Sequence, residues 1–403
     1  MHPLYTLTCL IWKDTTDCPL VFSRRPPIHQ DSDQKSLSVC LPQHTEHRII
    51  VVMARTKVLV IVLILALTEN YTDCSTHMTM EEVAELHFCE EKATYQDTTL
   101  AKFVKRCSPK AWRDFFTHKR VSEAIERADD AIRYAKKEID AIQAKQPKLL
   151  RYRYHIEPPM QLMLEAFNRV SPENIKVVIL GQDPTPQEGK ATGRAFSVED
   201  PRTVGSVMNV LLEVALEGWS VDLSNGDLSK WENQGVLLLN SALTIGEIEY
   251  IDENDNGKIK RKQVSHLGYW CEFTKLLIRY ISYDLAEPSV WILWGNVAQD
   301  FTVDRVFDTF SKCYNPTQAS TTDITKEQSL ISRPKNYVLM GGHPSPLSSA
   351  GGMNTFFAGH YFHCVNLFLY EKRHGAYIKW GLVDGHSEKL NVGSLFYPCP
   401  EFH

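Results

Sequence analysis

The chain has 403 residues, a formal net charge of −5 at pH 7 and 43% hydrophobic residues. These values are ordinary for a globular protein and exclude a polybasic nucleic-acid coat, so any binding of a polyanion must come from a local surface. The length suffices for one large α/β domain with extra segments, or for two domains of ordinary size.

The ten cysteines are scattered along the chain, without a CxxC pair or clustered His/Cys spacing. Such a pattern predicts neither a zinc site nor an iron–sulfur cluster. We therefore expect reduced thiols in an intracellular protein, with no metal and no cofactor.

Residues 1–107 show no sustained helical or strand period, which predicts a largely disordered N-terminal arm. Within it, the apolar run 58–67 follows Met53 and two basic residues and resembles a secretory signal or a short membrane anchor. The run is short for a bilayer span. A strand or helix packed on the main domain, or an untranslated leader, explains it equally, and the sequon at Asn70 matters only under the targeting interpretation.

Ordered structure is expected to begin near Trp112. A strong amphipathic helix follows, because apolar residues recur at helical spacing between charged ones, and we expect this stripe to pack in the core. The stripe comprises Ile125, Ala128, Ile132, Ala135, Ile139 and Ile142.

Four short apolar runs with strand character then alternate with helical stretches such as 203–218 and 269–283. The runs are 175–180, 236–239, 290–293 and 337–340. This alternation predicts one three-layer α/β/α domain with a mostly parallel four-stranded central sheet. We place this catalytic domain at 108–382 and a C-terminal tail at 383–403.

Each apolar run ends in a polar cluster, and the carboxyl ends of parallel strands meet in one crevice. The clusters would bring together an acid, an amide and a histidine, namely Asp183, Asn240 and His343. Taken singly, each is more often a turn or cap residue. Convergence from separate strand ends is what indicates a site.

The sequence around these residues matches the motifs of a known family. The run 177–198, VVILGQDPTPQEGKATGRAFSV, resembles the water-activating signature of family 1 uracil-DNA glycosylases. QGVLLLNSALT resembles the family's uracil-binding strand, WILWGNVAQ its Gly-Ser phosphate loop and HPSPLS its DNA-intercalating loop, while Glu157-Pro158-Pro159 resembles its proline-rich DNA loop. The resemblance covers roughly residues 108 to 382.

The resemblance implies catalytic roles for two residues. Asp183 would activate or orient the attacking water and offset positive charge on the sugar. His343, with a neutral imidazole, would donate a hydrogen bond to uracil O2, where negative charge grows as the base leaves.

It also implies substrate and DNA contacts. Asn240 would donate to uracil O4 and accept from N3–H, Phe196 would stack on the flipped base, and Gln182 would line the pocket. Leu347 would enter the base stack and fill the gap left by the flipped nucleotide. The DNA backbone would be contacted by Pro158, Pro159, Gly295, Asn296, Pro344, Ser345 and Ser348.

The sequence departs from the family at the pocket. Thr185 stands where the family usually has a tyrosine that excludes the thymine methyl group, so the pocket would admit C5-substituted uracils unless a neighbour refills the space. Pro186 and Thr192 replace histidines, and Asn296 replaces the serine of the Gly-Ser loop. The loop after Leu347 is longer than the family's and lacks its basic residue.

The sequence thus predicts a DNA glycosylase that hydrolyses the N-glycosidic bond of flipped-out uracil. We expect a monomer that binds single- and double-stranded DNA without metal or stable membrane association, in the nucleus, or in the host nucleus if viral. The alternatives are a glycosylase that also accepts thymine, and a replication accessory whose N-terminal arm binds repair or replication proteins. Joint presence of Asp183, His343, Asn240 and Phe196 favours the enzyme.

Overall fold

The computed structural model describes residues 80–145, 153–252, 257–300, 335–346 and 356–383, together with six short strands and Cys399. The chain divides into two compact units, Met1–Lys92 and Ala93–His403. Most of the tail predicted at 383–403 lies outside the described residues.

The first unit contains two small antiparallel strand pairs and a helix. Strand β1 (Leu37–Ser38) pairs with β4 (His77–Met78), and β2 (Ile50–Thr56) pairs with β3 (Leu59–Leu65). Helix α1 (Met80–His87) continues into a π-helical turn. Most of the apolar run 58–67 is therefore a strand. Within the described part of the chain, no helix is both long and apolar enough to cross a membrane.

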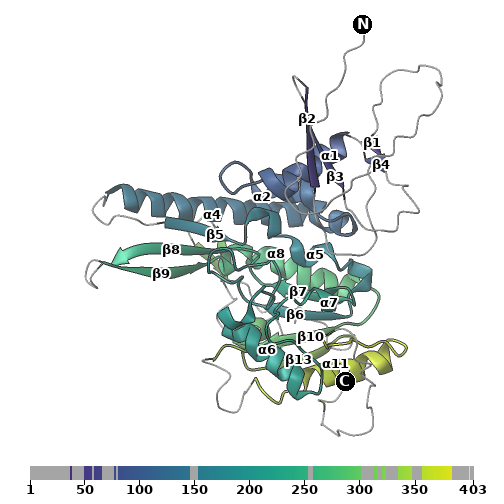
Figure 1. The fold of residues 1–403 in the computed structure, drawn as a ribbon. Helices are drawn as coiled ribbons and strands as arrows, with labels where there is room; N and C mark the ends of the chain where they lie inside the picture. Colours follow the sequence, from purple (N-terminus) through teal and green to yellow (C-terminus); the bar gives the residue numbers. More distant parts are fainter. Residues whose placement is uncertain are drawn as a thin grey trace, which may run out of the picture. The chain divides into compact units, whose positions relative to one another are not determined.

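The second unit is built on a parallel four-stranded sheet (Figure 1). Its order is β13-β10-β6-β7, formed by Tyr337–Gly341, Val290–Trp294, Val177–Gly181 and Val236–Asn240. All four strands coincide with the apolar runs of the sequence, so the predicted sheet is confirmed. Strands β6, β7 and β10 are buried along their whole length, as expected for a parallel sheet covered on both faces.

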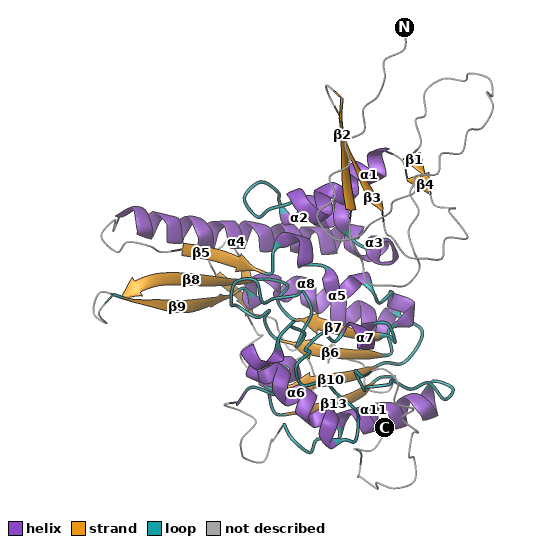
Figure 2. Ribbon diagram, in the orientation of Figure 1, coloured by secondary structure: helices purple, strands orange, loops and turns teal. Residues whose placement is uncertain are grey.

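Helices flank this sheet and supply its core (Figure 2). Helices α6 (Gly205–Leu216), α7 (Ser229–Glu232) and α11 (Tyr361–Lys372) pack on alternate residues of the four strands in one hydrophobic cluster. The intervening strand residues, such as Val178 and Leu237, are equally buried. The three-layer α/β/α prediction is thus confirmed.

Further helices precede and follow the first sheet strand. They are α2 (Leu100–Cys107), α3 (Arg113–Thr117), α4 (Lys119–Lys145), α5 (Glu165–Asn168), α8 (Leu267–Arg279) and α9 (Asn296–Gln299). Helix α4 is the amphipathic helix expected from the sequence. Helix α2 falls in residues that we assigned to the arm, yet it belongs to the second unit because Leu100, Phe103 and Val104 bury one helical face.

A second, antiparallel sheet was not predicted. Strands β5 (Arg153–Glu157), β8 (Ile245–Asp252) and β9 (Lys258–Ser265) form it in the order β5-β8-β9, and β11 (Lys312–Asn315) pairs separately with β12 (Ser320–Asp323). Charged residues dominate β9 and conceal its strand character. The Asn-Gly pair ending at Gly257, whose φ is +71°, is the hairpin signal that identifies it.

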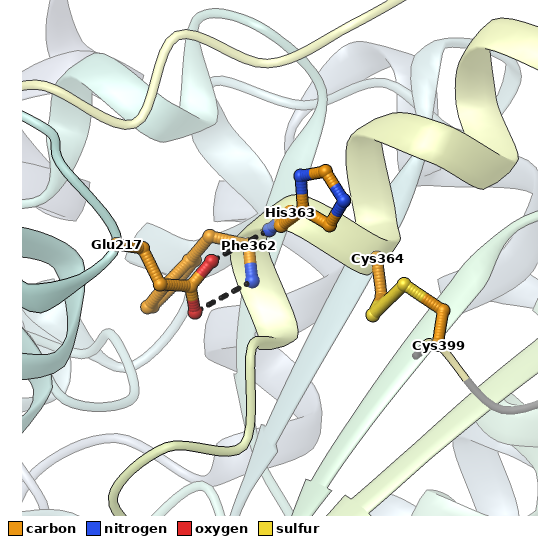
Figure 3. The surroundings of a disulfide bond; sticks show 5 residues. All are labelled: Glu217, Phe362, His363, Cys364 and Cys399. Atoms are coloured by element: carbon orange, nitrogen blue, oxygen red, sulfur yellow. Dashed lines mark hydrogen bonds between the residues drawn. A yellow bond between two sulfur atoms is a disulfide. The ribbon is translucent and has the colours of Figure 1, made fainter. Parts of the chain in front are cut away.

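The expectation that all cysteines are reduced is wrong. Cys364 on α11 forms a disulfide with Cys399, with an S–S distance of 2.16 Å (Figure 3). Cys89, Cys107 and Cys271 are also disulfide-bonded. Pairing of this kind depends on how the fold brings distant segments together, and scattered spacing along the sequence does not reveal it.

Candidate active site

The carboxyl ends of the four parallel strands meet at one edge of the sheet. Gly181 pairs in register with Asn240, and Trp294 pairs with Gly341. Beyond the strands, the Ser241 amide donates to the Gly181 carbonyl at 2.9 Å, and the Gly295 amide donates to the Gly341 carbonyl at the same distance. The segments that follow the strands are therefore tied to one another, as the sequence predicted.

Asp183 follows β6 and carries two side-chain hydrogen bonds. Gln182 Nε2 donates to Oδ2 at 2.9 Å, and Ser265 Oγ lies 2.9 Å from Oδ1 and 3.0 Å from Oδ2. Burial raises the pKa of Asp183, and the two hydrogen bonds oppose that rise. Sequence reasoning missed Ser265, because a serine at the end of a charged strand carries no motif.

Asn240 and Phe196 approach the same small position. A Cβ atom at Gly181 would lie 2.5 Å from Asn240 Oδ1 and 3.5 Å from Phe196 Cε2, so only glycine leaves room for both side chains. Phe196 itself has a positive φ of 57°. Two residues earlier, Arg194 donates to Glu232 at 2.7 Å and to Glu165 at 2.9 Å, which anchors the Phe196 loop.

His343 follows β13 and faces this group. The Ser345 amide donates to His343 Nδ1 at 3.0 Å, so Nδ1 is unprotonated and the ring proton of the neutral tautomer sits on Nε2. Burial lowers the pKa of His343, which favours the neutral ring. The centroids of the His343 and Phe196 rings lie 6.2 Å apart, and a Cβ atom at Gly295 would lie 3.0 Å from His343 Cβ.

Side chains of α6 and its C-cap bind the main chain after His343 at two places, Pro344 and residues 358–363. Asn209 Nδ2 donates to the Pro344 carbonyl at 2.7 Å. One helical turn on, Glu213 accepts from the amides of residues 358 and 359, each at 3.0 Å. Glu217, one turn further, accepts from Phe362 and His363 at the start of α11 (Figure 3). Spacing by four residues aligns Asn209 and Glu213 on one face of α6, and Glu217 is the residue at its C-cap.

These α6 residues also escaped the sequence analysis. Glu213 is fully buried, and burial raises the pKa of both glutamates, that of Glu217 to about 8. An acid on an otherwise apolar helix face, repeated after four residues, is the signal that indicates buried carboxylates with partners.

Of the residues expected to contact DNA, Gly295, Pro344 and Ser345 lie at this edge of the sheet. Pro158 follows a cis peptide bond, and its carbonyl accepts from Tyr95 Oη at 2.8 Å. Pro159 precedes a 3₁₀ turn, and Asn296 begins α9. Thr185 is half-buried. Leu347 and Ser348 lie outside the described residues.

The second unit resembles a known protein superfamily. Residues 167–361 match the model of the uracil DNA glycosylase superfamily. The chain is 34% identical over 223 residues to uracil-DNA glycosylase 2 of Bacteroides fragilis, a match that covers 55% of this chain and 81% of the relative.

The chain belongs to the uracil-DNA glycosylase family.

A second member, the uracil-DNA glycosylase of Lactococcus lactis, is 34% identical over 219 residues, covering 54% of this chain and 80% of the relative. The crystal structure of mimivirus uracil-DNA glycosylase is 22% identical, with a TM-score of 0.44, and the match covers 68% of this chain and 86% of that one. Across the described residues, no three His, Cys, Asp or Glu side chains are grouped to hold a metal ion.

Proposed function

We propose that this chain is a DNA glycosylase that releases free uracil from DNA and leaves an abasic site. The observation that carries the proposal is the meeting of Asp183, Asn240, Phe196 and His343 at one sheet edge in a member of the uracil-DNA glycosylase family. A scaffold that only bound DNA would have no chemical use for this combination.

Two residues carry the proposed chemistry. Water adds to C1′ of the deoxyribose and loses a proton to Asp183, while the C1′–N1 bond breaks and its electron pair leaves with uracil. The Asp183 carboxylate offsets the positive charge that develops on the sugar. His343 Nε2–H donates to uracil O2 and stabilises the departing base, a role that the hydrogen bond to Nδ1 supports.

Recognition of uracil is proposed to depend on Asn240 and Phe196. The Asn240 amide donates to O4 and accepts from N3–H, whereas cytosine presents the reverse pattern. Phe196 stacks on the base. Gln182, which is hydrogen-bonded to Asp183, lines the same pocket.

The duplex is proposed to open by base flipping. Leu347 fills the vacated stack, and the phosphodiester backbone is contacted by Pro158, Pro159, Gly295, Asn296, Pro344, Ser345 and Ser348. We propose a monomer whose catalytic domain begins before residue 108, since α2 belongs to the second unit, and whose first unit, Met1–Lys92, is available to repair or replication proteins.

Uracil release tests the proposal directly. The purified chain, without added metal, is incubated with a uracil-containing oligonucleotide, and free base is detected chromatographically. Release of uracil with formation of an alkali-labile abasic site is the expected result. Tight DNA binding without any release would instead favour the accessory protein.

Relaxed specificity at C5 is a second candidate, supported by the small, half-buried side chain of Thr185. A duplex with thymine opposite guanine, left uncut under conditions that excise uracil, would remove it. If thymine is left uncut, Thr185 does not set the base preference, and Thr185→Tyr should leave that preference unchanged.

Two features bear on cellular location, the proposed substrate and the disulfides. The proposed substrate favours the nucleus, whereas disulfides at Cys364, Cys271 and Cys107 are typical of oxidising compartments. Alkylation of free thiols during cell fractionation decides between them, because a nuclear pool would be labelled at these cysteines.

A further inference from the structure

Ser265 offers a hydrogen-bond donor to the proposed catalytic carboxylate from outside every recognised motif. It is the last residue of β9, at the base of the β8–β9 hairpin. Its Oγ lies 2.9 and 3.0 Å from the two oxygens of Asp183, residues that are 82 positions apart in sequence. Only the fold of the second sheet brings them together.

The direction of this hydrogen bond follows from its neighbours. The Leu267 amide donates to Ser265 Oγ at 3.2 Å, so the hydroxyl accepts there and its single proton is directed to another partner. Asp183 in its ionised form can only accept. Ser265 therefore donates to Asp183, and its proton is shared between the two carboxylate oxygens.

A buried network fixes the backbone next to Ser265. His266 is fully buried, and its Nδ1 and Nε2 lie 2.9 Å from Thr244 Oγ1 and Tyr154 Oη, respectively. Trp270 Nε1 donates to the same Thr244 hydroxyl at 2.8 Å. Since both nitrogens of His266 are engaged, the turn that carries Ser265 has little freedom to move away from Asp183.

We propose that Ser265 is a positioning residue that orients the Asp183 carboxylate for catalysis. Gln182 donates to one oxygen only, whereas Ser265 reaches both and so restrains rotation of the carboxylate about its last side-chain bond. Orientation of a catalytic group acts on turnover, because the misaligned carboxylate pays for realignment in the transition state. The inference rests on the proposed function.

Four variants of the full chain test it in single-strand uracil release. Ser265→Ala should lower kcat about 10- to 100-fold with KM unchanged, the range for loss of a hydrogen bond to a charged group. Ser265→Thr keeps the hydroxyl and should restore most of the rate. Ser224→Ala is the matched control, because Ser224 makes the same kind of bond to Asp222 on an exposed turn and should behave as wild type.

Ser265→Asp separates catalysis from helix capping. Aspartate still accepts the Leu267 amide but cannot donate and places a like charge beside Asp183, so its rate should fall below that of Ser265→Ala. Restoration of the rate by aspartate, or equal rates for Ser265→Asp and Ser265→Thr, would overturn the proposal, as would a fully active Ser265→Ala. A wild-type chain that releases no uracil would instead overturn the proposed function itself.

Discussion

The two halves of the candidate site are held in different ways. Asp183 is oriented by side-chain hydrogen bonds from Gln182 and Ser265, at the end of a fully buried strand. The segment after His343 is bound through main-chain groups instead. Asn209, Glu213 and Glu217, on α6 and at its C-cap, make side-chain hydrogen bonds to those groups. The first arrangement sets the direction of one carboxylate, and the second binds the main chain at Pro344 and at residues 358–363. We therefore expect changes in the first half to alter chemistry and changes in the second to alter duplex binding.

The largest effect is expected at Asp183. Asp183→Asn should lower kcat by about 10³-fold or more, because the isosteric amide neither accepts a proton from water nor offsets charge on the sugar. DNA affinity should survive, which a fluorescence-anisotropy titration measures. Asp222→Asn, on an exposed turn, is the control, and parallel loss of affinity and turnover in Asp183→Asn would contradict the assigned role.

The next effect concerns the disulfide between Cys364 and Cys399. Cys399→Ser should lower the free energy of unfolding by about 3–4 kcal/mol, since it releases a cross-link over 35 residues. Chemical denaturation under oxidising conditions measures this change. Cys364 follows His363, whose amide Glu217 binds, but neither cysteine is among the residues that orient Asp183 or bind the Pro344 carbonyl. We therefore expect kcat to be retained, and a proportionate loss of kcat would contradict the separation.

Glu217→Gln should lower the free energy of unfolding by about 2 kcal/mol, because the new amide group turns a donor toward a backbone N–H. Burial raises the Glu217 pKa from 4.5 to about 8, so the folded chain retains a proton that the unfolded chain has lost. The contribution of this group is fully present below pH 4.5 and is lost as the pH rises through about 8. Thermal unfolding from pH 5 to 9 should therefore show a difference between the two proteins that shrinks as the pH rises.

Glu371→Gln is the matched control for this prediction, because Glu371 is exposed on α11. It should unfold like the wild type at every pH. A Glu217→Gln difference that widens with pH would show that the ionised carboxylate is the stabilising form, and one that stays constant would show that folding does not raise the Glu217 pKa.

The smallest effect is expected at Asn209. Asn209→Ala removes one hydrogen bond to the Pro344 carbonyl, worth about 1 kcal/mol, or about fivefold in kcat/KM on duplex DNA. Single-stranded DNA should be cut at the wild-type rate, because it requires no wedge to hold the base out. Equal losses on both substrates would indicate that Asn209 acts on chemistry instead.

The strands and the polar residues at their ends were accessible from sequence because burial on both faces gives parallel strands continuous apolar runs. Asp183, Asn240 and His343 follow those runs directly, so topology alone placed them at one edge. Ser265 and Glu217 were not accessible in this way. Their partners lie 82 and 145 or 146 positions away, and no local period or motif encodes such a contact.

The β8–β9 hairpin and the disulfides were not predicted from the sequence, for related reasons. Strand β9 is largely exposed, so its composition reflects solvent and salt bridges, such as that from Arg261 to Glu249, more than a buried face. Cysteine pairing depends on the geometry of the finished fold.

The division between the two halves is tested most directly by the ratio of single-turnover rates on single-stranded and duplex uracil substrates, measured in parallel for Ser265→Ala and Asn209→Ala. We predict that Ser265→Ala slows both substrates by the same factor and leaves the ratio at its wild-type value, whereas Asn209→Ala changes the ratio by slowing only the duplex. A changed ratio in Ser265→Ala together with an unchanged one in Asn209→Ala would contradict the account.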